Sequence, residues 1–272
     1  MSGVILAVVE HPEFALQMLA ATRNLAILMG HARINVLAIR VPPESTILPS
    51  EEILTEAQCT AIRTREQHRM QALHAVFAAW EASTRGRELT VEWADIEGLA
   101  DALVGEWGRR SDFIVVNRLT HRDHAHERLA IHAALFDTDR PVLVVPPGAP
   151  THLGERVAIA WRDDKRTERS VLAALRLLPQ ARQVHVLAGE RPGGPAPAIP
   201  AILVEHGINA ELHVLPIGPG AFGAALLAAA HDVRADMLVM GAYTHSAWRD
   251  MIFGGVTRYM LANADLPVLM RH

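Results

Sequence analysis

Hydrophobic residues occur along the chain as short continuous runs that alternate with stretches of helical spacing. The run Val4–Val9 precedes a stretch, about residues 13 to 29, in which apolar residues recur every three or four positions. The second half opens the same way, with an apolar run at 157–161 and a helical pattern over about 166–178. Continuous apolar runs between helices predict parallel strands buried on both faces of a sheet.

Further apolar runs complete five predicted strands in each half, namely 34–41, 89–93, 113–116 and 142–145 in the first and 183–188, 210–215, 237–240 and 268–270 in the second. A long helical pattern at about 50–83 makes the first half longer. Ser50 is the expected N-cap of that helix, because its hydroxyl can accept a backbone N–H bond.

Two stretches are alike in residue type, order and spacing, which predicts an internal duplication. Asp112 opens Asp-Phe-Ile-Val-Val-Asn, and Asp236 opens Asp-Met-Leu-Val-Met-Gly. Each is followed by Pro-Val-Leu, which begins 29 positions after Asp112, at Pro141, and 31 positions after Asp236, at Pro267.

The segment 146–150, Pro-Pro-Gly-Ala-Pro, has the composition of a linker. We therefore predict two tandem domains, 1–148 and 154–272. Each is expected to be a doubly wound α/β domain of Rossmann-like or flavodoxin-like layout, with a five-stranded, mostly parallel sheet.

Composition narrows the classes of protein to consider. The 272 residues carry a net charge of −4 with no block of like charge, which argues against a nucleic-acid or polybasic membrane partner. A single cysteine, Cys59, allows no internal disulfide and fits a reducing compartment. No apolar run is long enough for a membrane anchor, so we expect a cytoplasmic protein.

A glycine-rich turn follows the predicted strand 237–240. Gly241 ends that strand, and Gly254-Gly255-Val-Thr257 opens the next helical pattern. Ligands of open α/β sheets bind at the carboxyl ends of the strands. A helix N-terminus offers free N–H groups and a partial positive charge, which suit a phosphate, and Thr257 can add a hydroxyl donor.

This turn resembles that of the universal stress protein family, whose nucleotide-binding members carry Gly-x2-Gly-x9-Gly-[Ser/Thr]. The same spacing occurs here at Gly241, Thr244, Gly254 and Gly255, with Thr244 in place of the second glycine and Gly255 in place of Ser or Thr. The sequence around this turn also resembles the sequences of tandem bacterial members of the family, most strongly over residues 205–270.

The resemblance implies that adenosine lies between the ends of the first and second strands of the second half, with its phosphates on the glycine loop. The implied nucleotide-binding residues are Ala160, Trp161, Arg162, Asp163, Ala188, Met240, Gly241, Thr244, His245, Gly254, Gly255, Val256 and Thr257. The implied ligand is ATP or another adenine nucleotide, with or without Mg²⁺.

The run Arg162-Asp163-Asp164 departs from the family, which commonly has Gly and Ser there. Carboxylates near an anion site repel phosphate by ~1 kcal/mol in water and by more in a cleft. Asp163 and Asp164 therefore point away, hold a nucleotide-linked Mg²⁺, or weaken binding. Arg162 can offset them by contacting phosphate or pairing with an Asp.

The first half lacks the glycine pattern. Its fourth predicted strand is followed by Asn117-Arg-Leu-Thr-His121, and its first by Glu10-His11-Pro12. We predict that this half does not bind nucleotide and persists because it pairs with the second half within the chain. The same chain could also pair with a second copy as a homodimer.

Four histidines, His121, His124, His126 and His132, lie near Asp123 and Glu127. Their spacing fits no standard zinc site, so we interpret them as a solvated face and predict no metal site.

We see no catalytic residues and predict a non-enzymatic stress-response or signalling module, with slow incidental ATP hydrolysis left open. The alternatives are a ligand-free interaction protein with a dead pocket and a slow metal-assisted nucleotidase.

Overall fold

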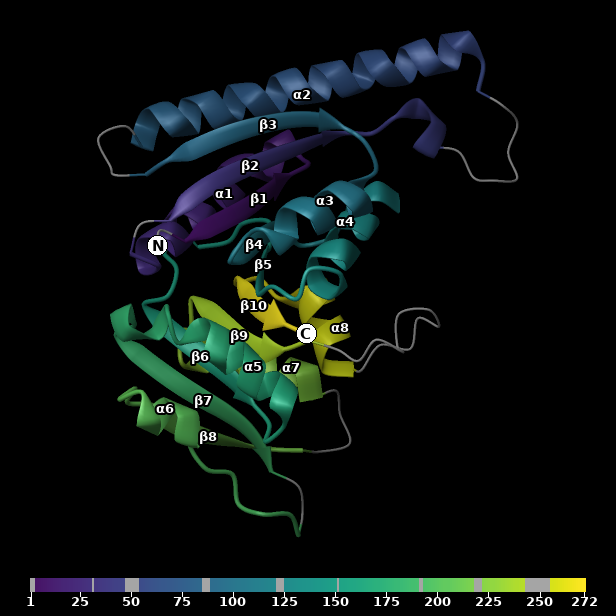
Figure 1. The fold of residues 1–272 in the computed structure, drawn as a ribbon. Coiled ribbons are helices and arrows are strands. Elements are labelled where there is room, and N and C mark those ends of the chain that lie inside the picture. Colours follow the sequence, from purple (N-terminus) through teal and green to yellow (C-terminus); the bar gives the residue numbers. More distant parts are fainter. Residues whose placement is uncertain are drawn as a thin grey trace.

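The computed structural model describes residues 3–30, 32–46, 54–84, 89–120, 125–150, 152–190, 193–217, 222–242 and 255–272. Its ten strands form one continuous sheet in the order β3-β2-β1-β4-β5-β10-β9-β6-β7-β8 (Figure 1). The predicted α/β class, with five mostly parallel strands contributed by each half, is confirmed, and the ten-stranded sheet fits two tandem domains.

The first half contains β1 (Val4–Val9), α1 (Pro12–Leu28), β2 (Arg33–Arg40), η1 (Pro43–Thr46), α2 (Glu56–Thr84), β3 (Val91–Glu97), α3 (Ala100–Arg109), β4 (Phe113–Asn117), α4 (Ala125–Phe136) and β5 (Val142–Val145). The second half contains β6 (Arg156–Trp161), α5 (Lys165–Ala174), η2 (Leu178–Gln180), β7 (Gln183–Glu190), α6 (Ala201–Glu205), β8 (Glu211–Pro216), α7 (Phe222–Asp232), β9 (Met237–Gly241), α8 (Gly255–Asn263) and β10 (Val268–Arg271).

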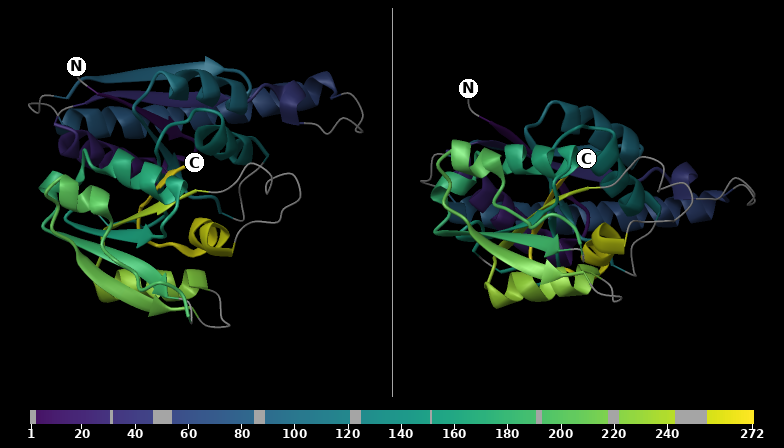
Figure 2. Two further views of the ribbon diagram at one scale, coloured as in Figure 1. Left: turned by 60° about the horizontal axis from the view of Figure 1, so that its bottom comes forward. Right: turned by 90° about the horizontal axis from the view of Figure 1, so that it is seen from below.

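Helices cover both faces of the sheet (Figure 2). Strand residues that alternate along the chain bury their side chains in two cores, one with α1, α2, α5 and α6, the other with α3, α4, α7 and α8. Both cores run through both halves. None of the described helices is both long and apolar enough to cross a bilayer.

The two halves join edge to edge at the centre of the sheet. β5 and β10 pair in the antiparallel direction with Leu143 opposite Leu269, and both side chains are fully buried. Every other strand pair of the described sheet is parallel. An ion pair between Arg271 and Asp139, 3.6 Å long, also crosses the junction. The sequence predicted that the halves pair, but not that they share one sheet.

The repeated aspartates have the same structural role in both halves. The Asp112 carboxylate accepts the backbone N–H of Val4, the first residue of β1, at 2.7 Å. The Asp236 carboxylate accepts the N–H groups of Gly154, Glu155 and Arg156 at 2.7, 2.9 and 3.2 Å, at the start of β6. Each aspartate thus fixes the first strand of its half beside the fourth.

The long helix of the first half begins later than the sequence pattern predicted. α2 starts at Glu56, whereas Ser50 lies outside the described residues. Thr55 and Gln58 form a reciprocal capping box, in which the Gln58 side chain accepts the Thr55 N–H and the Thr55 hydroxyl accepts the Gln58 N–H. Because Thr55 directly precedes Glu56 and its hydroxyl accepts the Gln58 N–H of the first turn, Thr55 is the N-cap.

Candidate functional site

The order of the strands reverses at β6, which pairs with β7 on one side and β9 on the other. Such a reversal leaves a crevice at the carboxyl ends of the strands, where ligands of open α/β sheets bind. Ala160 and Trp161 end β6, Ala188 lies near the end of β7, and Met240 and Gly241 end β9. The structure therefore brings these predicted site residues to the same edge of the sheet.

Asp164 caps α5. Its Oδ1 accepts the N–H groups of Arg166 and Thr167 at 3.1 and 2.9 Å, and its Oδ2 accepts from the Arg162 guanidinium. Burial would raise the pKa of Asp164, but the Thr167 N–H and Arg162 outweigh it, so the pKa is lowered. Both carboxylate oxygens of Asp164 accept hydrogen bonds, so this residue acts as the N-cap of α5. Asp163 is exposed at the same edge of the sheet.

Gly241 lies against the start of the same helix. A Cβ at this position would stand 3.2 Å from the backbone nitrogen of Thr167 and 3.4 Å from the carbonyl carbon of Arg166. These are backbone atoms that cannot rotate away. Close packing of α5 over the end of β9 is therefore sufficient reason for glycine here, whatever binds in the crevice.

In the crossover from β9 to β10, α8 begins on the carboxyl side of the strands, because β9 and β10 are parallel. Gly255, its first residue, is exposed, and a Cβ added there would meet no heavy atom within 4 Å. Val256 is half-buried, and Thr257 is only 7% exposed in the first turn. The other predicted residues of the glycine loop, Thr244, His245 and Gly254, lie outside the described residues.

An apolar wall stands at the end of β7. A Cβ on Gly189 would lie 2.8 Å from Ile217 Cδ1 and 2.9 Å from Phe222 Cζ. Sequence reasoning did not single out these two side chains, because they come from the connection after β8 and from the start of α7. The contact depends on how those segments fold back onto the sheet.

In the first half, α2 closes over the corresponding strand ends. Arg69 donates to the carbonyl oxygens of Glu10 at 2.8 Å and Ile39 at 2.6 Å. Glu66 accepts from Arg69 at 2.7 Å and from the Val41 N–H at 3.2 Å. Burial would raise the pKa of Glu66, but the hydrogen bond and charge of Arg69 outweigh it, so the pKa is lowered. In the second half, the described part of the matching connection contains one helix, the five-residue α6.

A carboxylate of the chain itself lies at the N-terminus of α4. Glu127, in the first turn, is 3% exposed. One of its oxygens lies 3.0 Å from His126 Nε2 and 3.7 Å from His11 Nε2. A helix N-terminus favours a negative charge, and here Glu127 supplies it. In α8 the first-turn residue that is buried is Thr257, which is neutral.

We expect Glu127 to make the protein sensitive to acid. Burial would raise its pKa, but the hydrogen bond and charge of His126 outweigh this and lower the pKa from 4.5. A lowered folded-state pKa means stability that is present above the unfolded value and lost as pH falls through the folded one. Urea denaturation of Glu127→Gln should therefore show a shallower loss of unfolding free energy below about pH 4.5 than the parent. Equal slopes for the two proteins would contradict this assignment.

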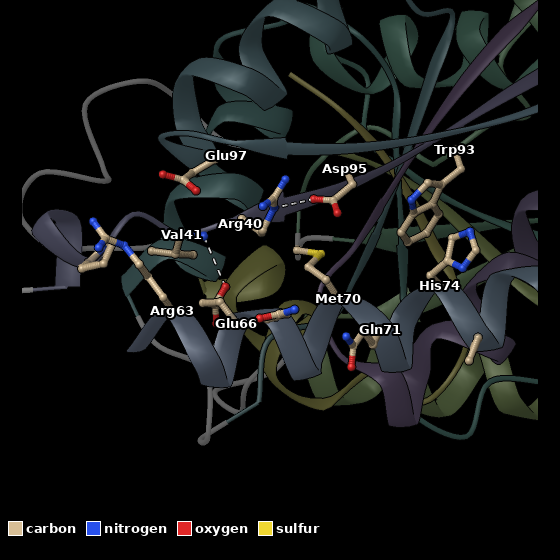
Figure 3. A pocket seen from close by; sticks show the side chains of 13 residues that line it. Arg40, Val41, Arg63, Glu66, Met70, Gln71, His74, Trp93, Asp95 and Glu97 are labelled. Carbon is tan, nitrogen blue, oxygen red and sulfur yellow. Dashed lines mark hydrogen bonds and ion pairs between the residues drawn. The ribbon is translucent and has the colours of Figure 1, made fainter. Parts of the chain in front are cut away.

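A cavity of about 720 Å³ opens between α2 and the β2–β3 edge of the first half (Figure 3). Its polar walls are largely paired within the protein, as Arg40 lies 2.7 Å from Asp95 and Glu66 is bound by Arg69. The cavity contains none of the predicted site residues.

The predicted histidine-rich face lies partly outside the described residues, which omit His121 and His124. His126 contacts Glu127, and His132 lies 3.8 Å from Asp137, which follows the end of α4. Among the described residues, these histidines are therefore engaged with neighbouring carboxylates.

The chain matches the model of the universal stress protein family over residues 114–272. Two solved structures share its fold at 15% sequence identity. A universal stress protein from Archaeoglobus fulgidus has a TM-score of 0.66, over 100% of this chain and 96% of its own. A putative universal stress protein from Pseudomonas aeruginosa has a TM-score of 0.60, over 99% and 93%. A comparison with curated proteins gives no match.

The family match spans more than half of the chain and includes all of β6 to β10. The chain therefore belongs to the universal stress protein family.

Proposed function

We propose that the second half binds an adenine nucleotide such as ATP, and that the chain acts as a cytoplasmic stress-response or signalling module. The observation that carries this proposal is the open N-terminus of α8 at Gly255, which starts on the carboxyl side of the parallel strands β9 and β10. Backbone N–H groups at such a terminus suit phosphate oxygens. Family membership supports the same ligand class.

The proposed pocket also offers surfaces for the rest of a nucleotide. Small-molecule sites combine apolar walls with a few polar groups. Ile217 and Phe222 provide apolar side chains at the end of β7. Thr257 provides a hydroxyl in the first turn of α8, and the exposed Arg162 guanidinium lies near the end of β6.

Contrast between the halves supports a single site per chain. In the first half, Arg69 and Glu66 occupy the space over β1 and β2, and the Glu127 carboxylate stands at the start of α4. A nucleotide phosphate there would meet a buried negative charge, which repels it. We therefore expect the first half to bind no nucleotide and to act through the shared sheet.

Calorimetric titration of the full chain with ATP, with and without Mg²⁺, tests the proposal. We expect one nucleotide bound per chain, and a Glu127→Gln variant should retain the same stoichiometry and affinity, because its change lies in the other half. Two equivalent sites would refute the assignment of one site per chain. No heat with any adenine nucleotide would favour a ligand-free interaction protein.

The second alternative is a slow metal-assisted nucleotidase, in which Asp163 would bind the metal ion. Asp164 already accepts from Arg162, Arg166 and Thr167, whereas Asp163 is exposed at the same edge. Phosphate release that requires Mg²⁺ and disappears in Asp163→Ala would favour the enzyme. Nucleotide binding without such release favours a binding module.

A further inference from the structure

Three side chains that can bind a metal meet on one face of the second half, near the amino ends of β7 and the edge strand β8. In the parallel register of β7 and β8, His185 lies directly opposite Glu211, and His213 follows two residues later on β8. Residues two apart in a strand share a face. The pairing of the strands therefore brings all three side chains to one place.

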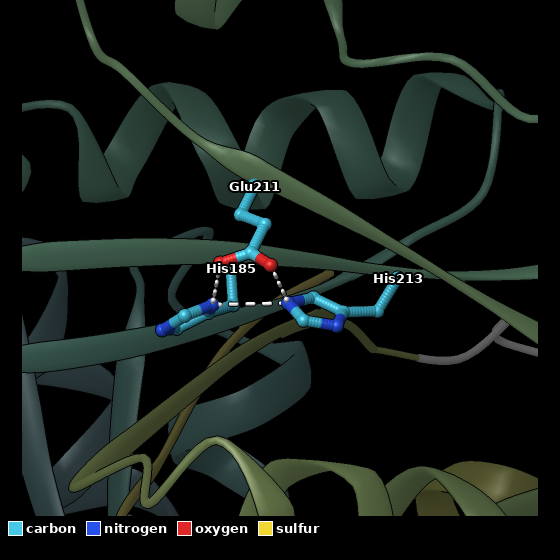
Figure 4. Close-up of side chains that lie close together, drawn as sticks. All are labelled: His185, Glu211 and His213. Atoms are coloured by element: carbon cyan, nitrogen blue, oxygen red, sulfur yellow. Dashed lines mark hydrogen bonds and ion pairs between the residues drawn. The ribbon is translucent and has the colours of Figure 1, made fainter.

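The potential ligand atoms of these residues converge (Figure 4). His185 Nδ1 lies 3.0 Å from His213 Nε2 and 3.7 Å from Glu211 Oε2, and His213 Nε2 lies 3.9 Å from Glu211 Oε1. Tetrahedral zinc, with bonds of about 2.0–2.2 Å, separates its ligand atoms by about 3.3–3.5 Å. Shifts of a few tenths of an ångström would place all three around one ion.

Burial differs among the three in a way that leaves one side open. The His185 side chain is 8% exposed, while those of His213 and Glu211 are 28% and 69% exposed. His185 is therefore held by the packed face of the sheet, whereas β8 is an edge strand whose side chains can adjust. Solvent can reach the cluster from the Glu211 side.

We propose that His185, Glu211 and His213 bind one divalent transition-metal ion of the zinc type, with water as the fourth ligand. Two imidazoles and one carboxylate suit Zn²⁺ and its neighbours, whereas Mg²⁺ and Ca²⁺ prefer all-oxygen ligands. The site lies toward the amino ends of the strands, away from the nucleotide crevice at their carboxyl ends, and so does not depend on the proposed function.

The surroundings of the outer ring nitrogen of His185 indicate moderate affinity. His185 Nε2 is buried and has no hydrogen-bond partner among the described residues. A metal-binding histidine usually donates its other N–H to an acceptor, and losing that contact weakens binding 10–100-fold or so. We therefore expect micromolar rather than nanomolar binding.

Calorimetric titration of the chelator-treated full chain with ZnCl₂ tests the site. We expect one site in the micromolar range, no heat with Mg²⁺ alone, and a visible tetrahedral absorption band with Co²⁺. Zinc affinity should fall at least tenfold in His213→Gln and in Glu211→Gln. Both of these side chains lie on the accessible edge strand, so folding should survive, which circular dichroism can verify.

His231→Gln is a matched control. His231 also pairs with a carboxylate, Asp265, at 2.7 Å, but among the described residues no third potential ligand lies beside that pair. Its zinc affinity should equal that of the parent. Zinc binding that persists unchanged in the His213→Gln, Glu211→Gln double variant would overturn the proposal, as would no binding by the parent at micromolar zinc. In either case the cluster would be a hydrogen-bonded histidine pair.

Discussion

Replacing Gly255 with aspartate is expected to lower the affinity of the chain for ATP by roughly 100-fold while leaving it folded. A Cβ at this position meets open space, so the new side chain displaces nothing. Aspartate in the first turn also stabilises a helix. The added charge would instead stand where the proposed phosphates bind, and repulsion at about 4 Å amounts to several kcal/mol in a partly desolvated crevice.

Gly255→Asn is the matched control, because asparagine has the shape of aspartate without its charge. Calorimetry should show an affinity for ATP within a few-fold of the parent for the asparagine variant and a loss of about two orders of magnitude for aspartate. Equal affinities in both variants would place the phosphates elsewhere. Unfolding curves should show that both variants are folded and at least as stable as the parent.

Asp236→Ala is expected to lower the free energy of unfolding by about 2–3 kcal/mol, at about 1 kcal/mol for each of three lost hydrogen bonds. The donors are the backbone N–H groups of Gly154, Glu155 and Arg156, which lead into β6. Burial raises the pKa of Asp236, and these three donors offset it only in part. The carboxylate thus fastens the start of the second half to β9.

The internal repeat supplies the comparison for this change. Asp112 accepts one backbone N–H, that of Val4, and lies 3.4 Å from Arg176 in an exposed ion pair. Exposed pairs contribute little, so Asp112→Ala should cost about 1 kcal/mol. Urea denaturation of the two variants measures the difference. A larger cost for Asp112→Ala would contradict the role given to Asp236.

The two acidic residues after β6 illustrate what spacing alone leaves open. The sequence allowed Asp163 and Asp164 to point away, to hold Mg²⁺ or to repel phosphate. The structure gives Asp164 to the N-terminus of α5 and to Arg162. Which residue caps a helix depends on where the first helical turn begins. The amino-acid sequence alone locates that start only to within a few residues.

By itself, the sequence determined the local elements and their repetition. Apolar runs and helical spacing predicted ten strands with intervening helices, and the Asp-to-Pro spacing around Asp112 and Asp236 predicted two similar halves. These features depend on residues close together in the chain. The spacing of hydrophobic residues along the sequence reflects which side chains of a strand or helix are buried.

Only the tertiary structure decided how distant segments meet. It joined β5 to β10 through Leu143 and Leu269 and laid Arg69 of α2 over the ends of β1 and β2. It also set His185 opposite Glu211. Each of these contacts depends on strand register or helix placement, and a shift of one residue in register would turn every side chain of a strand to the other face.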